Sequence, residues 1–167
     1  MKTRIALAAL LVSTAVLAAD PAPPQLRLPG SPDRAMDPGS LLGKDRSDVR
    51  LEDSQGNVTV FHGVPLIEVL EKNGLETKTM ASQRKVAPCV VLVTTRDGYT
   101  VVFSIGELLM HRSDPRVFLV SETAQGPLPA NEGPVRMVVL GDRARSSYAL
   151  ARVEVRYLAE NTPARKP

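Results

Sequence analysis

Residues 89–103 have the sequence CVVLVTTRDGYTVVF, in which two apolar runs flank a short polar turn. Both runs are rich in β-branched residues and are too short for buried helices, so they predict two interior strands. Asp97-Gly98 supplies the left-handed backbone geometry that a tight connection between strands requires. This stretch therefore predicts a β-hairpin at the centre of a β-rich domain.

The segments after this hairpin continue the strand pattern. Ser104, followed three residues later by Glu107, is a capping-box pattern that predicts the start of a short helix, and Asp114-Pro115 ends it. Residues 141–150 are expected to form a loop with at most one helical turn. Three further strands are predicted from the runs RVFLVSE, VRMVVL and RVEVRYL.

The segments before it add a second hairpin and a second helix. Residues 49–61 alternate apolar and polar positions around Gly56-Asn57, which predicts two strands joined by a tight turn. Residues 65–73 have an apolar stripe at helical spacing and predict a short amphipathic helix, whereas residues 77–85 are polar and are expected to form a loop. About seven strands and two short helices in mixed order predict an α+β domain, mostly β, with one mixed sheet.

The amino-terminal part has a different composition from this domain. Residues 1–19 contain two basic residues, a 13-residue apolar run and small residues at the end, the layout of a secretory signal peptide. The apolar run is too short to span a bilayer as a helix. We therefore expect a periplasmic or secreted protein, with a Pro-rich linker or arm at 20–48, a globular domain at 49–158 and a flexible tail at 159–167.

The charge balance argues against nucleic acid as a partner. Cleavage after residue 19 would remove Lys2 and Arg4, which leaves 19 basic against 18 acidic residues. A nucleic-acid-binding domain usually shows a strong basic stripe instead. The late arginines form one basic cluster, which is either a binding surface or a set of solvated residues at strand edges: Arg136, Arg143, Arg145, Arg152 and Arg156.

Catalytic motifs with a recognised spacing are missing from the chain. It has no G-x-S-x-G, H-E-x-x-H, C-x-x-C or Walker sequence. The single cysteine, Cys89, lies in an apolar run and is expected to be a buried hydrophobic residue, since a reactive thiolate needs a basic or metal environment. No metal ligands and no catalytic residues are predicted.

The segment from Gly141 to Ser147 is the strongest candidate for ligand binding. Its glycine allows close approach of backbone amides to an anion, its arginines offer planar donor forks, and its serines add hydroxyls. A phosphate or a pterin-like ligand would suit such a loop. A plain polar loop is the alternative that the residue types leave open.

The order of motifs from residue 63 onward resembles the molybdopterin-binding oxidoreductase domain of the sulfite oxidase family, especially its small exported bacterial members. The motifs are Gly63-Val64-Pro65-Leu66, Asp97-Gly98-Tyr99, Pro127-Leu128-Pro129, Gly133-Pro134-Val135-Arg136 and Leu140-Gly141-Asp142, and the similarity covers residues 49–157. It implies a mostly β fold with a mixed sheet. It also gives the Asp97 turn a second interpretation, as a motif beside a ligand groove or partner surface.

In the family, a cysteine thiolate before the G-V-P-L segment binds molybdenum, and a basic residue next to Ser or His contacts the pterin phosphate. This sequence has no cysteine before Gly63, and Cys89 follows that segment. The resemblance assigns Arg145, Ser146 and Arg136 to cofactor binding. It implies a non-catalytic or degenerate member that binds an anionic or pterin-like ligand or a periplasmic protein; the alternative is a molybdopterin-dependent oxidoreductase with non-cysteine ligation.

Overall fold

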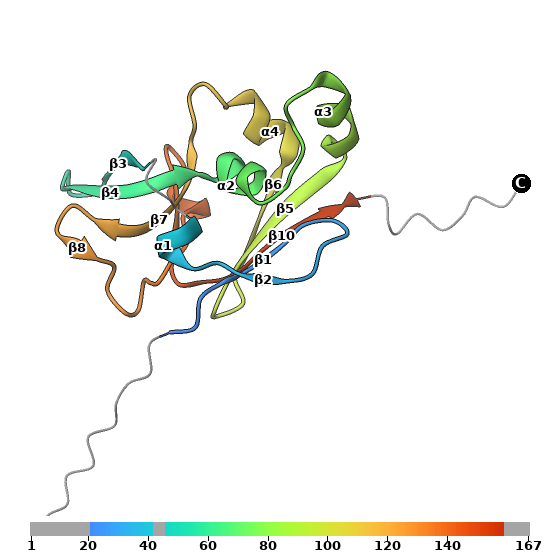
Figure 1. The fold of residues 1–167 in the computed structure, drawn as a ribbon. Helices are drawn as coiled ribbons and strands as arrows, with labels where there is room; N and C mark the ends of the chain where they lie inside the picture. The colour runs from blue at the N-terminus through green and yellow to red at the C-terminus, as the bar shows by residue number, and fades with distance from the viewer. Residues whose placement is uncertain (1–20, 42–45, 159–167) are drawn as a thin grey trace, which may run out of the picture.

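The computed structural model describes residues 21–41 and 46–158, and this part of the chain forms two five-stranded β-sheets (Figure 1). The first sheet has the strand order β2-β1-β10-β5-β6. It comprises β1 (Gln25–Arg27), β2 (Arg34–Ala35), β5 (Cys89–Thr95), β6 (Thr100–Ser104) and β10 (Leu150–Tyr157). All its pairings are antiparallel except that of β1 with β10, so this sheet is mixed.

The second sheet is antiparallel and has β7 at its centre. In the order β3-β4-β7-β8, with β9 also paired to β7, it comprises β3 (Ser47–Glu52), β4 (Val58–Pro65), β7 (Val117–Thr123), β8 (Gly126–Pro127) and β9 (Arg136–Val139). The predicted α+β, mostly β class is confirmed. The single sheet of about seven strands is corrected to two sheets with ten strands among the described residues.

Two helices explain why the strands divide into two sheets. α2 (Leu66–Lys72) follows β4 directly, and α4 (Ile105–Met110) follows β6 directly, so each helix carries the chain from one sheet toward the other. Both were predicted, and the Ser104 hydroxyl accepts a hydrogen bond from the Glu107 amide at 2.9 Å as the capping pattern requires. Two further elements are the short α1 (Pro38–Leu41) and the 3-10 turn η1 (Arg143–Arg145), the single helical turn expected in residues 141–150.

The prediction of a loop at residues 77–85 is wrong, because α3 covers Met80–Val86. Thr79 and Ser82 form a reciprocal capping box at its start, which satisfies amides that have no partner within the helix. Only Val86 of this helix is buried, so the segment lacks the apolar periodicity by which a helix is recognised in a sequence.

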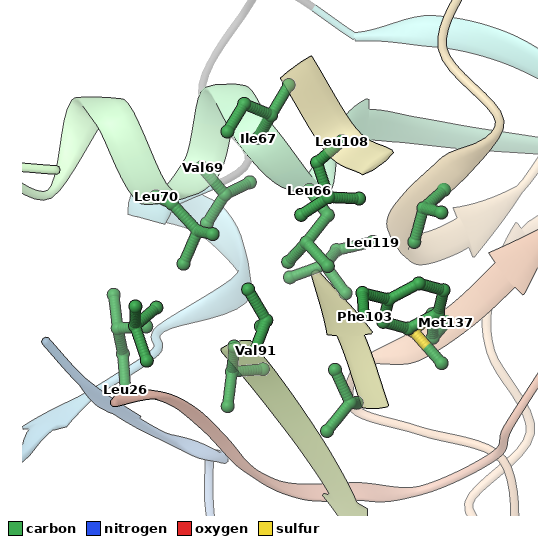
Figure 2. Packing of buried hydrophobic residues seen from close by; sticks show 14 of the residues in the cluster. Leu26, Leu66, Ile67, Val69, Leu70, Val91, Phe103, Leu108, Leu119 and Met137 are labelled. Atoms are coloured by element: carbon green, nitrogen blue, oxygen red, sulfur yellow. The ribbon is translucent and has the colours of Figure 1, made fainter. Parts of the chain in front are cut away.

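The main hydrophobic core lies between the first sheet and α2 (Figure 2). Leu66, Ile67, Val69 and Leu70 of α2 are buried against Val91 and Phe103 of the sheet and Leu119 of β7, and burying each such side chain contributes about 1.5–3 kcal/mol. A smaller cluster comprises Val49, Phe61, Phe118, Val120 and Val138, on the other side of the second sheet.

The described part of the Pro-rich segment packs on the domain. β1 extends the first sheet by pairing in parallel with β10, and Leu26, Leu28 and Met36 belong to the main core. The segment is thus an arm that completes the sheet edge in residues 21–41. The predicted signal peptide at 1–19 and the tail at 159–167 lie outside the described residues, and none of the described helices has the length and apolar character needed to cross a bilayer.

The hairpin from which the fold was predicted is present. β5 and β6 pair from Val90–Ser104 to Thr94–Thr100, and Gly98 has a φ of +88° in the turn. The Asp97 carboxylate accepts hydrogen bonds from the Tyr99 amide and the Thr95 hydroxyl. The Tyr99 hydroxyl donates to the Ala144 carbonyl oxygen at 2.9 Å, so the turn also supports η1.

Candidate anion-binding site

The loop after β9 is held in place by its own polar side chains. The Asp142 carboxylate caps η1 by accepting from the Arg145 amide at 3.2 Å, and the Ser146 hydroxyl accepts from the Val139 amide at 2.9 Å. Ser147 then pairs with Met137 through two backbone hydrogen bonds of 2.9 Å. These contacts fix the direction in which each arginine of the loop leaves the backbone.

The structure separates the three residues that were assigned to cofactor binding. Arg136 and Ser146 line one pocket, and Arg145 lines a cavity formed by other elements. Arg145 ends the 3-10 turn η1, whereas Ser146 has extended backbone, and these neighbours in the sequence line different sites.

The pocket that contains Arg136, here called the Arg136 pocket, lies between the β3–β4 hairpin and the loop after β9. Its volume is about 320 Å³, and its lining includes Phe61, Arg136, Arg143, Ser146 and Tyr148. The Arg143 guanidinium donates to the carbonyl oxygen of Glu52, which links the loop to the hairpin across the pocket. The walls of the pocket are therefore tied together by an arginine that also lines it.

Arg136 is the buried cation of this pocket, with a side chain that is only 8% exposed. Its guanidinium carbon lies 4.1 Å from the centroid of the Tyr148 ring and 4.8 Å from that of Phe61, which places the charge between two aromatic faces. One nitrogen, Nη1, donates to Glu132 at 2.7 Å. The Nε atom is buried and has no hydrogen-bond partner among the described residues.

An unpaired donor on a buried cation is unusual. Buried polar atoms are nearly always hydrogen-bonded, and leaving one unsatisfied costs about 1–3 kcal/mol. A ligand oxygen or a water molecule that accepts from Nε removes this cost. No described residue supplies this acceptor, and an anion is the acceptor that a guanidinium binds most strongly.

One of the two acidic residues that line the pocket, Asp53, is engaged by its own hairpin. The pKa of Asp53 is lowered chiefly by a hydrogen bond from the Asn57 side-chain amide and next by the Asn57 backbone amide. Its two oxygens accept from the Gln55 amide at 2.8 Å and from Asn57 at 2.9 and 2.8 Å. This carboxylate is therefore engaged in the turn of the β3–β4 hairpin, where it shapes the pocket wall.

Arg145 is engaged by two carboxylates. Its Nε donates to Asp142 at 2.7 Å and its Nη1 to Glu107 at 2.8 Å, and its guanidinium carbon lies 5.0 Å from the Phe103 ring centroid. Both acids raise the pKa of Arg145, Glu107 more than Asp142. Two of the three guanidinium nitrogens of Arg145 are thus engaged within the protein.

A molybdenum–pterin group can be tested against the residues present. The described residues contain no group of three or more His, Cys, Asp or Glu side chains placed to hold a metal ion. Cys89 is 1% exposed and belongs to the main core, as predicted for a buried hydrophobic residue, and does not line the Arg136 pocket. The guanidinium donors of the pocket fit the phosphate of a pterin, and its lining includes no cysteine thiolate.

Sequence reasoning missed two groups of this pocket. Tyr148 is half-exposed and stacks on Arg136, and Phe61 lies far away in the sequence, on β4. Arg143 was predicted only as part of the basic cluster and of the candidate loop Gly141–Ser147, without a cofactor-binding role of its own. An aromatic residue two positions after Ser146 was the signal available for Tyr148. A scan against protein-family models and a search of curated proteins give no match to the chain.

Proposed function

We propose that this chain is an exported, non-catalytic binding module, a reduced relative of the molybdopterin domain of the sulfite oxidase family, that binds a small anionic ligand in the Arg136 pocket. The observation that carries the proposal is the buried Arg136 guanidinium with an unpaired Nε donor in a pocket of about 320 Å³. Arg143 adds a second guanidinium to the pocket, and Tyr148 adds a flat apolar face beside Arg136.

The same arrangement suggests which ligands bind best. A phosphate ester on a planar ring places its charge on the two arginines, and its ring meets the half-exposed Tyr148. Such a ligand is a pterin phosphate without its metal, which agrees with the resemblance and with the missing thiolate. In this proposal the protein binds the ligand without transforming it, since the pocket offers hydrogen-bond donors and a stacking surface.

The proposal is tested by titration of the purified mature protein with inorganic phosphate and then with a phosphorylated pterin, followed by calorimetry. Arg136→Lys keeps the positive charge but removes the Nε donor, and it is expected to weaken binding about tenfold or more. Arg143→Gln is expected to weaken it by a similar factor. Arg156→Gln, on β10 and outside this pocket, is the matched control and leaves the affinity unchanged.

Metal analysis of protein exported from cells with intact cofactor synthesis separates this function from the alternative. Metal-free protein that binds the pterin phosphate supports the binding module. A stoichiometric amount of tightly held molybdenum would overturn it in favour of an oxidoreductase with non-cysteine ligation. Unchanged titration curves for Arg136→Lys and Arg143→Gln would remove the pocket from the functional site.

A further inference from the structure

A second cavity lies on the other side of the loop after β9 and is not used by the proposed function. It has a volume of about 230 Å³ and is enclosed by α4, the start of α2, the start of β7 and the residues that follow β9. We call it the Arg145 cavity, and its principal lining residues are Ile67, Glu107, Leu108, His111, Arg116 and Arg145.

Three apolar side chains line part of the Arg145 cavity. Ile67, Leu108 and Val139 line it and are 3%, 5% and 2% exposed, respectively. A ligand site commonly combines such a surface with a few convergent polar groups. A cavity of this volume suits a compact organic molecule smaller than a nucleotide.

The charged residues of the cavity fall into two groups. Arg145 is held by Glu107 and Asp142 and forms a closed triad with them. Arg116 is exposed and His111 half-buried, and within residues 21–41 and 46–158 neither side chain has a hydrogen-bond or ion-pair partner. The side-chain donors available to a ligand are therefore those of Arg116 and His111.

The triad also limits the charge of the ligand. It contains two carboxylates and one guanidinium, so it carries one net negative charge near the cavity wall. A doubly charged phosphate would meet this negative charge at close range, whereas a single carboxylate can pair with Arg116 at lower cost. The backbone at the Arg116 end is fixed, because the Leu140 amide donates to the Arg116 carbonyl oxygen at 2.8 Å.

We propose that the Arg145 cavity binds a small organic monocarboxylate, with the carboxylate on Arg116 and His111 and the hydrocarbon part on Ile67, Leu108 and Val139. This site is separate from the Arg136 pocket, and the two are lined by different residues. It gives the protein a second specificity that does not depend on the anion site described above.

The test uses benzoate as the probe and benzamide as its neutral analogue of the same shape. In amide NMR spectra of the mature protein, benzoate is expected to cause saturable shifts at His111, Leu140 and Gly141. Benzamide is expected to bind at least about tenfold more weakly, because it lacks the charge that pairs with Arg116. Raising the salt concentration weakens benzoate binding and leaves benzamide nearly unaffected.

Variants distinguish this site from the first one. Arg116→Gln is expected to lower benzoate affinity about tenfold or more, and Arg50→Gln, an exposed arginine on β3 outside the cavity, leaves it unchanged. Arg136→Lys also leaves benzoate affinity unchanged while it weakens phosphate binding. The proposal is overturned if benzoate gives no saturable shifts, if benzamide binds equally well, or if Arg116→Gln binds like the wild type.

Discussion

Arg136 and Arg145 belong to the same short stretch of chain, and each lies over one phenylalanine ring, yet their surroundings differ. Arg136 is buried over Phe61, has one carboxylate partner and keeps an unpaired donor. Arg145 is about one-third exposed over Phe103 and is bound by two carboxylates. The comparison separates a buried cation with an unpaired donor from a cation that two carboxylates hold.

The difference follows from the sheets beneath them. Arg136 is part of β9, whose backbone is paired with β7, so its side chain has a fixed direction toward the smaller cluster. Arg145 ends η1, where Asp142 is placed by the turn itself and Glu107 is supplied by α4. A sequence motif that contains several arginines therefore does not show which of them can bind a ligand.

The two phenylalanines provide the largest expected effect. Phe103→Ala is expected to lower the free energy of unfolding by about 4 kcal/mol, because Phe103 is 1% exposed in the large core and truncation leaves a cavity. Phe61→Ala, in the cluster of five buried residues, is expected to cost about 3 kcal/mol. Urea denaturation measures the free energy of unfolding of both variants. A larger loss for Phe61→Ala than for Phe103→Ala would show that the smaller cluster contributes more to stability than the main core.

Arg136→Met is expected to cost about 2–3 kcal/mol, since it leaves the Glu132 carboxylate without its partner and removes the charge between two rings. Glu132→Gln in the same background should recover part of this loss, because it removes the unpaired charge. The double-mutant cycle is measured by urea denaturation. Additive effects of the two substitutions would show that the ion pair contributes nothing to stability.

Cys89→Ser places a hydroxyl in the apolar core and is expected to lower the free energy of unfolding by about 1–2 kcal/mol. Phosphate and pterin phosphate affinities are expected to stay at the wild-type level, because Cys89 is not part of the Arg136 pocket. Thermal denaturation and calorimetry measure the two quantities. A folded variant that has lost ligand or metal binding would contradict the structural role of this residue.

The sequence was most informative where local patterns determine structure. The β5–β6 hairpin, α2 and the capped start of α4 were all predicted, since alternation, helical spacing and capping residues act over a few positions. The division into two sheets could not be predicted in this way. It depends on α2 and α4 crossing between layers, and on which strands become neighbours after the chain has folded.

The candidate site could likewise be predicted only in part from the sequence. Arg136 and Ser146 were named from their motifs, and the structure places them in one pocket. Their aromatic neighbour Phe61 comes from β4, and Glu107, which binds Arg145, comes from α4. Contacts between segments so far apart in sequence are set by tertiary packing and leave no periodic signal.

The smallest expected effect is a change in stability at acidic pH, through the Asp142 carboxylate. The pKa of Asp142 is lowered below its usual value of 3.8, first by the hydrogen bond from the Arg145 guanidinium and next by that from the Arg145 amide. A lowered folded-state pKa means that the stabilisation is present above pH 3.8 and is lost as the pH falls through the folded-state value. Asp142→Asn keeps a capping side chain but cannot ionise, so its stability should change less with pH below 3.8 than that of the wild type.

Arg145→Gln is the matched variant, because it removes the guanidinium that lowers the Asp142 pKa most. The Asp142 pKa is expected to return toward 3.8, and stability is expected to depend less on pH below that value. Melting temperatures between pH 2 and pH 5, together with a carboxyl-detected NMR titration of Asp142, measure both consequences. An Asp142 pKa that is unchanged in Arg145→Gln would mean that the Arg145 guanidinium does not engage this carboxylate in solution. Arg145 would then keep one carboxylate partner, Glu107, as Arg136 keeps Glu132, and the contrast between the two arginines would be weaker.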